Sequence, residues 1–234
     1  MHRYEQHCPI ARAAEVVAES WTLLIVRELL CGNECRVDIA KGLPKIAPSV
    51  LGRRLRTLES HGLVTRVVEA REVSYRLTAA GRELRPIVEQ LGAWGQRWLD
   101  RPRLGDLDPE LLVYDICREI DRARLPADPL TVEVDFADAP QPRRWWLILS
   151  AAEVVAGQRH PDTAAAVRVS CTLGALAGVW LGHVTWLQAV RDRAIMLAGE
   201  TAAIRSLIDC LGASRFAGMA RVDEPLPRPA GDRG

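Results

Sequence analysis

The sequence lacks several features that would assign the protein to a membrane, secreted or common enzyme class. Its 234 residues contain no run of 18 or more apolar residues, and the opening MHRYEQHCPI has no apolar signal region. We therefore expect a soluble, cytoplasmic protein with no membrane partner. The motifs G-x-S-x-G and H-E-x-x-H and a glycine-rich phosphate loop are also missing. These absences predict that the protein is not an enzyme and has no cofactor.

The cysteines follow no disulfide framework and no metal-ligand spacing. They are Cys8, Cys31, Cys35, Cys117, Cys171 and Cys210. In a cytoplasmic chain such scattered cysteines are most simply free thiols. The pair four residues apart, Cys31 and Cys35, is interrupted by Gly32 and has no histidine nearby, so we expect no metal site.

The two halves of the chain carry opposite net charges. Residues 1–103 hold 17 Lys and Arg against 12 Asp and Glu, whereas residues 104–234 hold 14 against 18. The overall net charge of +1 hides this difference. A basic half suggests an anionic partner for that half alone.

Stretches rich in proline and charge divide the chain into parts. DRPRLGDLDP, starting at Asp100, has the composition of a linker, and EPLPRPAGDRG at the end has that of a disordered segment. We predict a first domain at 1–99, a linker at 100–108, a second domain at 109–222 and a disordered tail at 223–234.

The first half has the hydrophobic pattern of four helices, a hairpin and a longer helix. The expected helices cover 8–18, 21–31, 36–41, 48–61 and 79–99, and the expected strands cover 63–68 and 73–77. This order is that of a winged helix-turn-helix domain, in which the helix before the hairpin enters the major groove of DNA.

That helix, in the stretch IAPSVLGRRLRTLESHGLV, has a buried and an exposed side. Leu51, Leu55 and Leu58 follow helical spacing and predict a core-facing stripe, while the arginines fall on the opposite side. A solvated arginine face is the alternative reading of the helix alone, but the helix-hairpin context favours DNA. The predicted DNA contacts are Lys45, Ser49, Arg53, Arg54, Arg56, Thr57 and Arg71, of which Lys45 and Arg71 would contact phosphates.

Residues 8–99 resemble the HxlR-type transcriptional regulators. The matching segments are Cys8-Pro-Ile, Trp21 to Leu30, Leu43-Pro44, Val50-Leu51, Arg54-Leu55, Leu58-Glu59, Gly62-Leu-Val64 and Tyr75-Arg-Leu-Thr78. The resemblance implies a homodimer that binds operator DNA, with terminal helices in the dimer contact. It would place Trp94 and Trp98 there, although a core role is equally plain. Some members sense oxidants or electrophiles through a cysteine at the position of Cys8. A buried, unreactive thiol is the alternative reading of Cys8.

Four features depart from the family pattern. Ala47 stands where a capping Ser or Thr is usual, which costs about 1 kcal/mol. Gly52 lies inside the helix and costs roughly 0.8–1 kcal/mol. Arg36 replaces a hydrophobic residue in the preceding helix, and the wing, with Glu69-Ala-Arg-Glu72 at its tip, is short. These departures affect the expected DNA affinity but leave the fold unchanged.

The second half has the pattern of an α+β domain with a mostly antiparallel sheet and helices on one face. The expected helices cover 109–124, 173–182, 185–192 and 201–212, and the expected strands cover 130–136, 144–149, 152–157, 166–171 and 195–199. Residues 167–211 resemble the sterol-carrier-protein-like fold, whose members hold an apolar ligand between sheet and helices.

The residues assigned to such a ligand site are Trp145, Trp180, His183 and Trp186. Core packing is the alternative for the tryptophans, and a structural hydrogen bond is the alternative for His183. Because side chains alternate along a strand, Trp145 and Trp146 should face opposite sides of the sheet.

Together these patterns predict a transcriptional regulator with an α+β fold. It would bind double-stranded DNA as a homodimer through helix 48–61 and respond to a small hydrophobic ligand in the second domain. Two alternatives remain open. One is a redox or electrophile sensor acting through Cys8. The other is a lipid carrier or cryptic enzyme whose winged helix binds another protein.

Overall fold

A computed structural model describes residues 4–70, 72–139, 141–219 and 222. The chain divides into two compact units, residues 1–92 and 93–234. The division falls inside a helix, a few residues before the predicted linker. Within the described residues no helix is long and apolar enough to cross a membrane.

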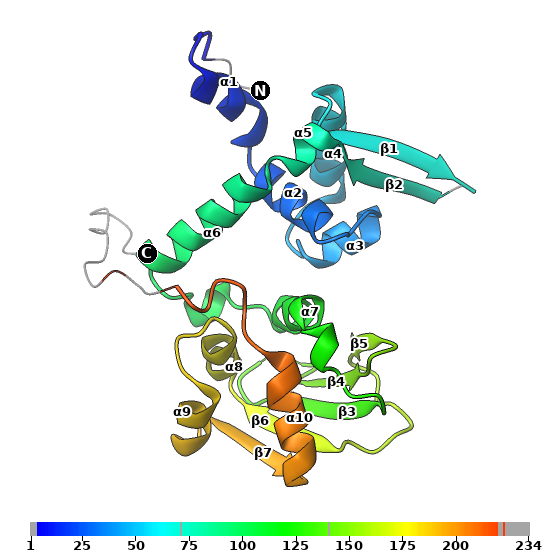
Figure 1. The fold of residues 1–234 in the computed structure, drawn as a ribbon, viewed down its shortest axis with the longest axis vertical. Coiled ribbons are helices and arrows are strands. Elements are labelled where there is room, and N and C mark those ends of the chain that lie inside the picture. Colours follow the sequence, from blue (N-terminus) through cyan, green and yellow to red (C-terminus); the bar gives the residue numbers. More distant parts are fainter. Residues whose placement is uncertain (1–3, 71, 140, 220–221, 223–234) are drawn as a thin grey trace. The chain divides into compact units, whose positions relative to one another are not determined.

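The first unit is a small helical domain with a two-stranded wing (Figure 1). Its helices are α1 (Pro9–Val17), α2 (Thr22–Leu30), α3 (Arg36–Lys41), α4 (Pro48–Ser60), α5 (Ala79–Arg82) and α6 (Arg85–Trp98), the last of which continues into the second unit. Strands β1 (Val64–Glu69) and β2 (Glu72–Leu77) form the wing, with Val64 opposite Leu77 and Glu69 opposite Glu72. The winged helix-turn-helix prediction is confirmed.

The core of this unit joins α2, α3, α4 and the wing. Its fully buried side chains include Ile25, Ile39, Leu55 and Leu58, each 0% exposed, and Tyr75 of β2, 1% exposed. The leucine stripe of α4 therefore faces the core, as its spacing predicted. In contrast, neither α1 nor α6 contains a buried residue.

One predicted helix is divided in two. The pattern favoured a single helix over 79–99, but α5 ends at Arg82 and α6 begins at Arg85. Pro86 has no amide hydrogen to donate to the carbonyl of Arg82, so the helical ladder cannot pass through this point. Thr78 caps α5 by accepting a hydrogen bond from the amide of Gly81 (3.1 Å).

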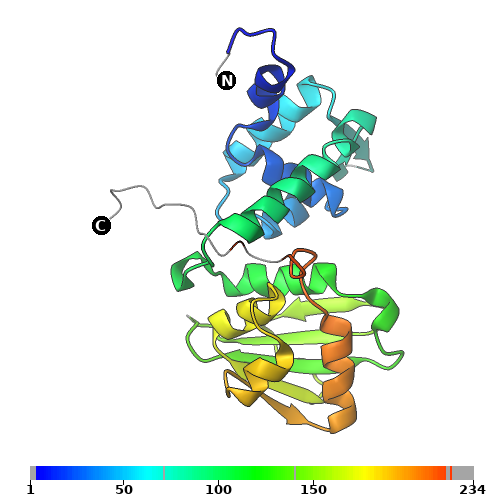
Figure 2. The ribbon, with the colours of Figure 1, turned by 60° about the vertical axis from the view of Figure 1, so that its left-hand side comes forward.

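The second unit is a five-stranded sheet covered by helices on one face (Figure 2). Its helices include α7 (Pro109–Glu119), α8 (Leu173–Trp180), α9 (Trp186–Arg191) and α10 (Thr201–Leu211). Short 3-10 turns occur at Leu104–Asp106 and Arg122–Arg124. The strands are β3 (Leu130–Phe136), β4 (Arg144–Leu149), β5 (Val154–Gly157), β6 (Val167–Cys171) and β7 (Ile195–Gly199).

The strand order is β5-β4-β3-β6-β7, and only the β3–β6 pair in it is parallel. The prediction of a mostly antiparallel sheet in an α+β unit is confirmed. Alternation along β4 separates its tryptophans, because Trp145 joins the core under the helices while Trp146 faces the other side. There the ring of His160, from the segment between β5 and β6, lies 4.3 Å from the Trp146 ring.

Candidate nucleic-acid interface

Helix α4 presents a polar surface opposite its leucine stripe. Ser49, Arg53, Arg56 and Ser60 are exposed and share one face of the helix. Among the described residues, no carboxylate forms an ion pair with Arg53 or Arg56. Both guanidinium groups are therefore available to an anion, and an arginine fork can bond a phosphate or a guanine edge.

Arg54 differs from its neighbours, and the expectation that it shares the exposed side is wrong. Its side chain is only 13% exposed. The Nε atom donates to the carbonyl oxygen of Ser20 (3.0 Å), and the guanidinium pairs with the carboxylate of Glu19. Glu19 and Ser20 lie 35 and 34 residues earlier, between α1 and α2, so no local spacing could reveal this contact. Arg54 thus fastens α4 to the turn before α2.

The remaining predicted contacts have different surroundings. Lys45 is exposed in the segment before α4. Thr57 is half-buried, and its hydroxyl donates to the carbonyl oxygen of Arg53 (3.1 Å). Arg71, at the tip of the wing, lies outside the described residues. An open hollow of about 610 Å³ is lined by Arg53, Arg54 and Thr57 together with residues 18–20.

The N-terminus of α4 has no capping side chain. Ala47 occupies the cap position in extended conformation, and Pro48 begins the helix. No side chain there accepts a hydrogen bond from the first amides. Pro48 has no N–H, and the amides of Val50 and Leu51 donate to the carbonyl oxygen of Ala47, so the first turn keeps the positive end of the helix dipole without a side-chain cap.

Arg36 contributes a contact that sequence reasoning missed. It begins α3, and its Nε and Nη2 atoms donate to the hydroxyl oxygen of Tyr75 at 3.1 and 2.8 Å. Its guanidinium carbon lies 5.6 Å from the centre of the Tyr75 ring. The only sequence signal was that Arg36 replaces the apolar residue expected there. Its partner Tyr75 lies 39 residues later in the sequence, in strand β2 of the wing.

Two other cations of the first unit, Arg76 and Lys41, are paired with carboxylates. Arg76 of β2 donates to Glu34 (2.8 Å), which raises the pKa of Arg76 above its ordinary value. Lys41 pairs with Asp38 (2.7 Å). The pKa of the Asp38 carboxyl is lowered, first by a hydrogen bond from the Cys35 thiol and then by Lys41. These pairs leave less net positive charge at Arg76 and Lys41 than at Arg53 or Arg56.

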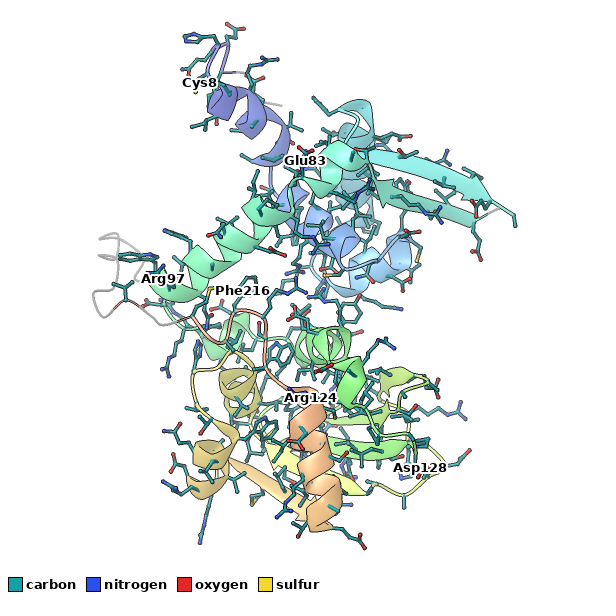
Figure 3. All side chains as sticks on the ribbon, viewed as in Figure 1. Cys8, Glu83, Arg97, Arg124, Asp128 and Phe216 are labelled. Carbon is teal, nitrogen blue, oxygen red and sulfur yellow. The ribbon has the colours of Figure 1, made fainter. Side chains whose placement is uncertain are left out.

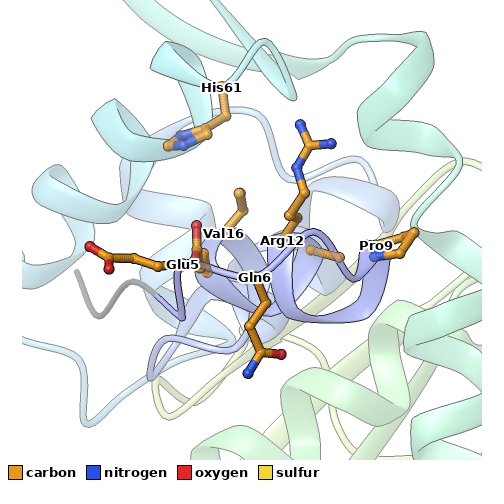
Figure 4. Close-up of a pocket in the computed structure, with 8 residues that line it drawn as sticks. Glu5, Gln6, Pro9, Arg12, Val16 and His61 are labelled. Atoms are coloured by element: carbon orange, nitrogen blue, oxygen red, sulfur yellow. The ribbon is translucent and has the colours of Figure 1, made fainter.

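A second open hollow, of about 690 Å³, lies between the N-terminal segment, α1 and the end of α4 (Figure 4). Its lining includes both cations and carboxylates, with Arg12 and His61 alongside Glu5 and Glu15. Such mixed charge does not favour a polyanion. Cys8 stands at the start of α1 (Figure 3), partly exposed, but does not line this hollow.

The tryptophans of the proposed ligand site are packed inside the second unit. Trp145 and Trp180 are 5% and 6% exposed. Trp180 and Trp186 line a void of about 10 Å³, and Trp186 also borders a second void of about 10 Å³ against the sheet. Each void has room for roughly one water molecule. The space expected for an apolar ligand at these residues is therefore nearly filled in this conformation.

Two indole groups in this core lack hydrogen-bond partners. The Nε1 atoms of Trp145 and Trp186 are buried and have no acceptor among the described residues. His183 lies apart from the voids, with its Nε2 atom 3.3 Å from the side-chain nitrogen of Gln96. That amide also donates to the carbonyl oxygen of Leu181 (2.8 Å).

Comparisons with known proteins identify the first half of the chain. Residues 16–103 match the family model described as HxlR-like helix-turn-helix. The HTH-type transcriptional regulator sll1512 of Synechocystis is 34% identical over 97 residues, which cover 40% of this chain and 72% of sll1512. YvaP of Bacillus subtilis, another HTH-type transcriptional regulator, is also 34% identical over 97 residues, covering 40% of this chain and 90% of YvaP.

A solved structure overlaps the chain over a similar length. The redox regulator HypR in its oxidized form is 30% identical and covers 41% of this chain and 100% of its own, with a TM-score of 0.36. The curated relatives and the family model agree with the helix-turn-helix and wing of the first unit. This chain belongs to the HxlR-like helix-turn-helix family of DNA-binding transcriptional regulators.

Proposed function

We propose that the protein binds operator DNA as a homodimer, with α4 in the major groove. The observation that carries this proposal is the polar face of α4, where Arg53 and Arg56 are exposed with no carboxylate partner among the described residues. Arg53 and Ser49 would reach base edges. Lys45 and Arg71 would bind phosphates, while Arg54, held by Glu19, would orient the helix.

The test removes both exposed arginines of α4. The double variant Arg53→Ala and Arg56→Ala should lose specific binding to fragments selected from genomic DNA, measured by fluorescence anisotropy, while its helical circular dichroism is unchanged. The control, Arg191→Ala with Arg205→Ala, removes the same charge from exposed positions of the second unit. Equal affinity of the α4 variant and the control would contradict the proposed role of α4.

The homodimer part of the proposal rests on exposed apolar side chains of α1 and α6. Ile10 is 80% exposed, and Ile87, Leu91 and Trp94 of α6 are 51%, 50% and 46% exposed. The three α6 residues lie at i, i+4 and i+7, so they form one stripe. A second copy of the chain would cover such a stripe, since contiguous apolar surface of this kind is unfavourable in water.

Leu91→Glu tests the dimer. A charge in the middle of the stripe should shift the protein toward monomer in sedimentation analysis and weaken operator binding, because half-sites are bound together by a dimer. The control Glu89→Gln changes charge at a neighbouring position. A Leu91→Glu protein that stays dimeric would exclude this interface.

For the second unit we propose a sterol-carrier-like ligand-sensing role and no catalysis. The support is the element order β6-α8-α9-β7-α10, whose helices lie on one face of the sheet, together with the small apolar voids beside Trp186. Because the two voids are small, a chain-like or flat apolar ligand would have to displace Trp186. A ligand that binds both states of the dimer equally would not regulate anything, so binding must favour one state.

A library of lipids and aromatic compounds tests this role through three readouts on one protein. A true effector stabilises the folded protein by about 2.7 kcal/mol at a hundredfold excess over Kd and so raises the melting temperature. It also quenches tryptophan fluorescence and changes operator affinity. Trp145, Trp180 and Trp186 are the expected reporters. If no compound moves either melting temperature or DNA affinity, the second unit is a structural appendage.

A second mode of regulation would act through Cys8. Its thiol is partly exposed at the N-cap of α1 and makes no capping hydrogen bond. Hydrogen peroxide should then weaken operator binding by the wild-type protein but not by Cys8→Ser. Equal responses of the two proteins would remove Cys8 from the regulatory mechanism.

A further inference from the structure

Arg36 is an exposed arginine held in one position. Two of its nitrogen atoms donate to the hydroxyl of Tyr75, a residue that is 1% exposed and belongs to the domain core. Exposed arginines ordinarily sample many rotamers and lose that freedom on binding a ligand. Because Tyr75 holds the Arg36 guanidinium through Nε and Nη2, its remaining N–H groups keep a defined direction.

The Arg36 guanidinium lies beside the place where α4 has no side chain. A Cβ atom built on Gly52 would lie 4.0 Å from Nη1 and Nη2 of Arg36 and 3.6 Å from Nη1 of Arg56. The two guanidinium groups thus converge over one glycine, from α3 and from α4. Gly52 is buried, whereas Arg36 and Arg56 are exposed, so the two guanidinium groups lie over the glycine at the surface of the domain.

The charge at this place is uncompensated. Among the described residues, neither Arg36 nor Arg56 has a carboxylate partner. The nearby acids are used elsewhere: Glu34 binds Arg76, and Asp38 binds Lys41 and the Cys35 thiol. Two like charges held close together repel one another, and a shared anion reverses the sign of that interaction.

We propose that Arg36 and Arg56 form a phosphate-binding site over Gly52 and that its ligand is a backbone phosphodiester of the bound DNA. This inference rests on the proposed binding of operator DNA and adds a contact from α3. Tyr75 is a positioning residue for Arg36. Arg56 then binds backbone, and base reading is left to Ser49 and Arg53 on α4. The departures at positions 36 and 52 are two parts of one site.

The experiment compares three variants in DNA binding measured at several salt concentrations. Arg36→Ala should lower affinity about tenfold for specific and unrelated sequences alike and reduce the slope of log affinity against log salt by about 0.9. Tyr75→Phe should lower affinity less and leave the slope unchanged, since the charge remains. The matched control is Arg76→Ala, which removes a neighbouring cation that Glu34 already neutralises, and it should change little.

Melting temperatures and circular dichroism check that each variant is folded, and Arg36→Lys provides a second test that keeps the charge. An unchanged slope for Arg36→Ala, or an equal loss for Arg76→Ala, overturns the site while α4 recognition stands through the Arg53 and Arg56 variants. Failure of the wild-type protein to bind any DNA overturns both proposals. If inorganic phosphate raises the melting temperature of the wild type but not of Arg36→Ala, and the DNA slope is unchanged, the site takes free anions instead.

Discussion

The candidate functional residues are exposed in the first unit and mostly buried in the second. In the first unit, Arg53 and Arg56 are exposed on a helix whose other face is buried. In the second, Trp145 and Trp180 are buried and the neighbouring voids hold about 10 Å³ each. A surface that binds a polyanion can be complete before its ligand arrives. A site for an apolar ligand in a filled core exists only after side chains move.

Trp180→Ala should have the largest effect, because it removes a large buried ring from the second unit. The expected cost is about 3–5 kcal/mol of unfolding free energy. Differential scanning calorimetry should show an earlier transition for this unit only. The milder Trp180→Phe serves as control. If Trp180→Ala instead raises affinity for an apolar probe at little cost in stability, the core is more adaptable than its packing indicates.

Alkaline pH should have the second-largest effect, a loss of stability of the second unit. Burial raises the pKa of the Cys117 thiol to about 12, and burial, followed by nearby Asp138 and Asp135, raises that of Cys171 to about 12. In the unfolded chain these thiols ionise near 9.0. Both states are protonated below that pH, so the stabilisation is complete there. It is lost as pH rises from about 9 toward 12, because only the unfolded chain releases protons.

The measurement is the melting temperature of the second unit between pH 8 and pH 11. A variant with Cys117→Ala and Cys171→Ala should show a shallower decline, which separates these thiols from tyrosines and other groups that titrate in the same range. Identical slopes in the variant and the wild type would show that the buried thiols do not control alkaline stability.

Arg54→Ala and Arg53→Ala should separate a contribution to folding stability from a contribution to DNA binding within one helix. Loss of Arg54 removes its bonds to Glu19 and Ser20 and should cost about 1–2 kcal/mol. Arg53→Ala should leave the melting temperature of the first unit unchanged and weaken DNA binding. Thermal unfolding and anisotropy on both variants give the comparison. A reversed pattern would mean that the two arginines have been assigned the wrong roles.

Ala47→Ser should produce the smallest effect, a gain of about 1 kcal/mol in the first unit. Its hydroxyl could accept a hydrogen bond at the uncapped start of α4. The second unit already has such caps, since Asp108, Thr172 and Thr185 cap α7, α8 and α9. Ala47→Gly is the control. Weaker operator binding by a more stable Ala47→Ser protein would indicate that the start of α4 contacts DNA.

Periodicity predicted most elements because each depends on neighbours in sequence. The leucines of α4 and the alternating residues of β4 follow this rule, and the comparison with relatives supports the family. Periodicity could not predict contacts between segments that are distant in sequence. Glu19 meets Arg54 and Tyr75 meets Arg36 only after α1, α3 and the wing have packed around α4.

The volume beside Trp186 was also beyond sequence reasoning. Small apolar residues and tryptophans at helical spacing describe an open pocket and a filled core equally well. Which one results depends on how Ile116, Leu176 and Leu211 meet the indole rings, and these come from three different helices. The exposed charge of a helix can be predicted from the sequence of that helix, whereas the volume of a cavity depends on the packing of the whole domain.

Because β3 pairs with a strand far along the chain, the second unit can complete its sheet only later in synthesis on the ribosome than the first unit. The β1–β2 pair of the first unit is complete once residue 77 has emerged. In the second unit β3 is the central strand, and its parallel partner β6 ends only at Cys171. Until then one edge of β3 is unpaired, and edges of this kind can join other chains. The DNA-binding unit can therefore fold while the second unit is still a nascent hairpin, and a pause in translation before residue 171 would leave that hairpin open to aggregation.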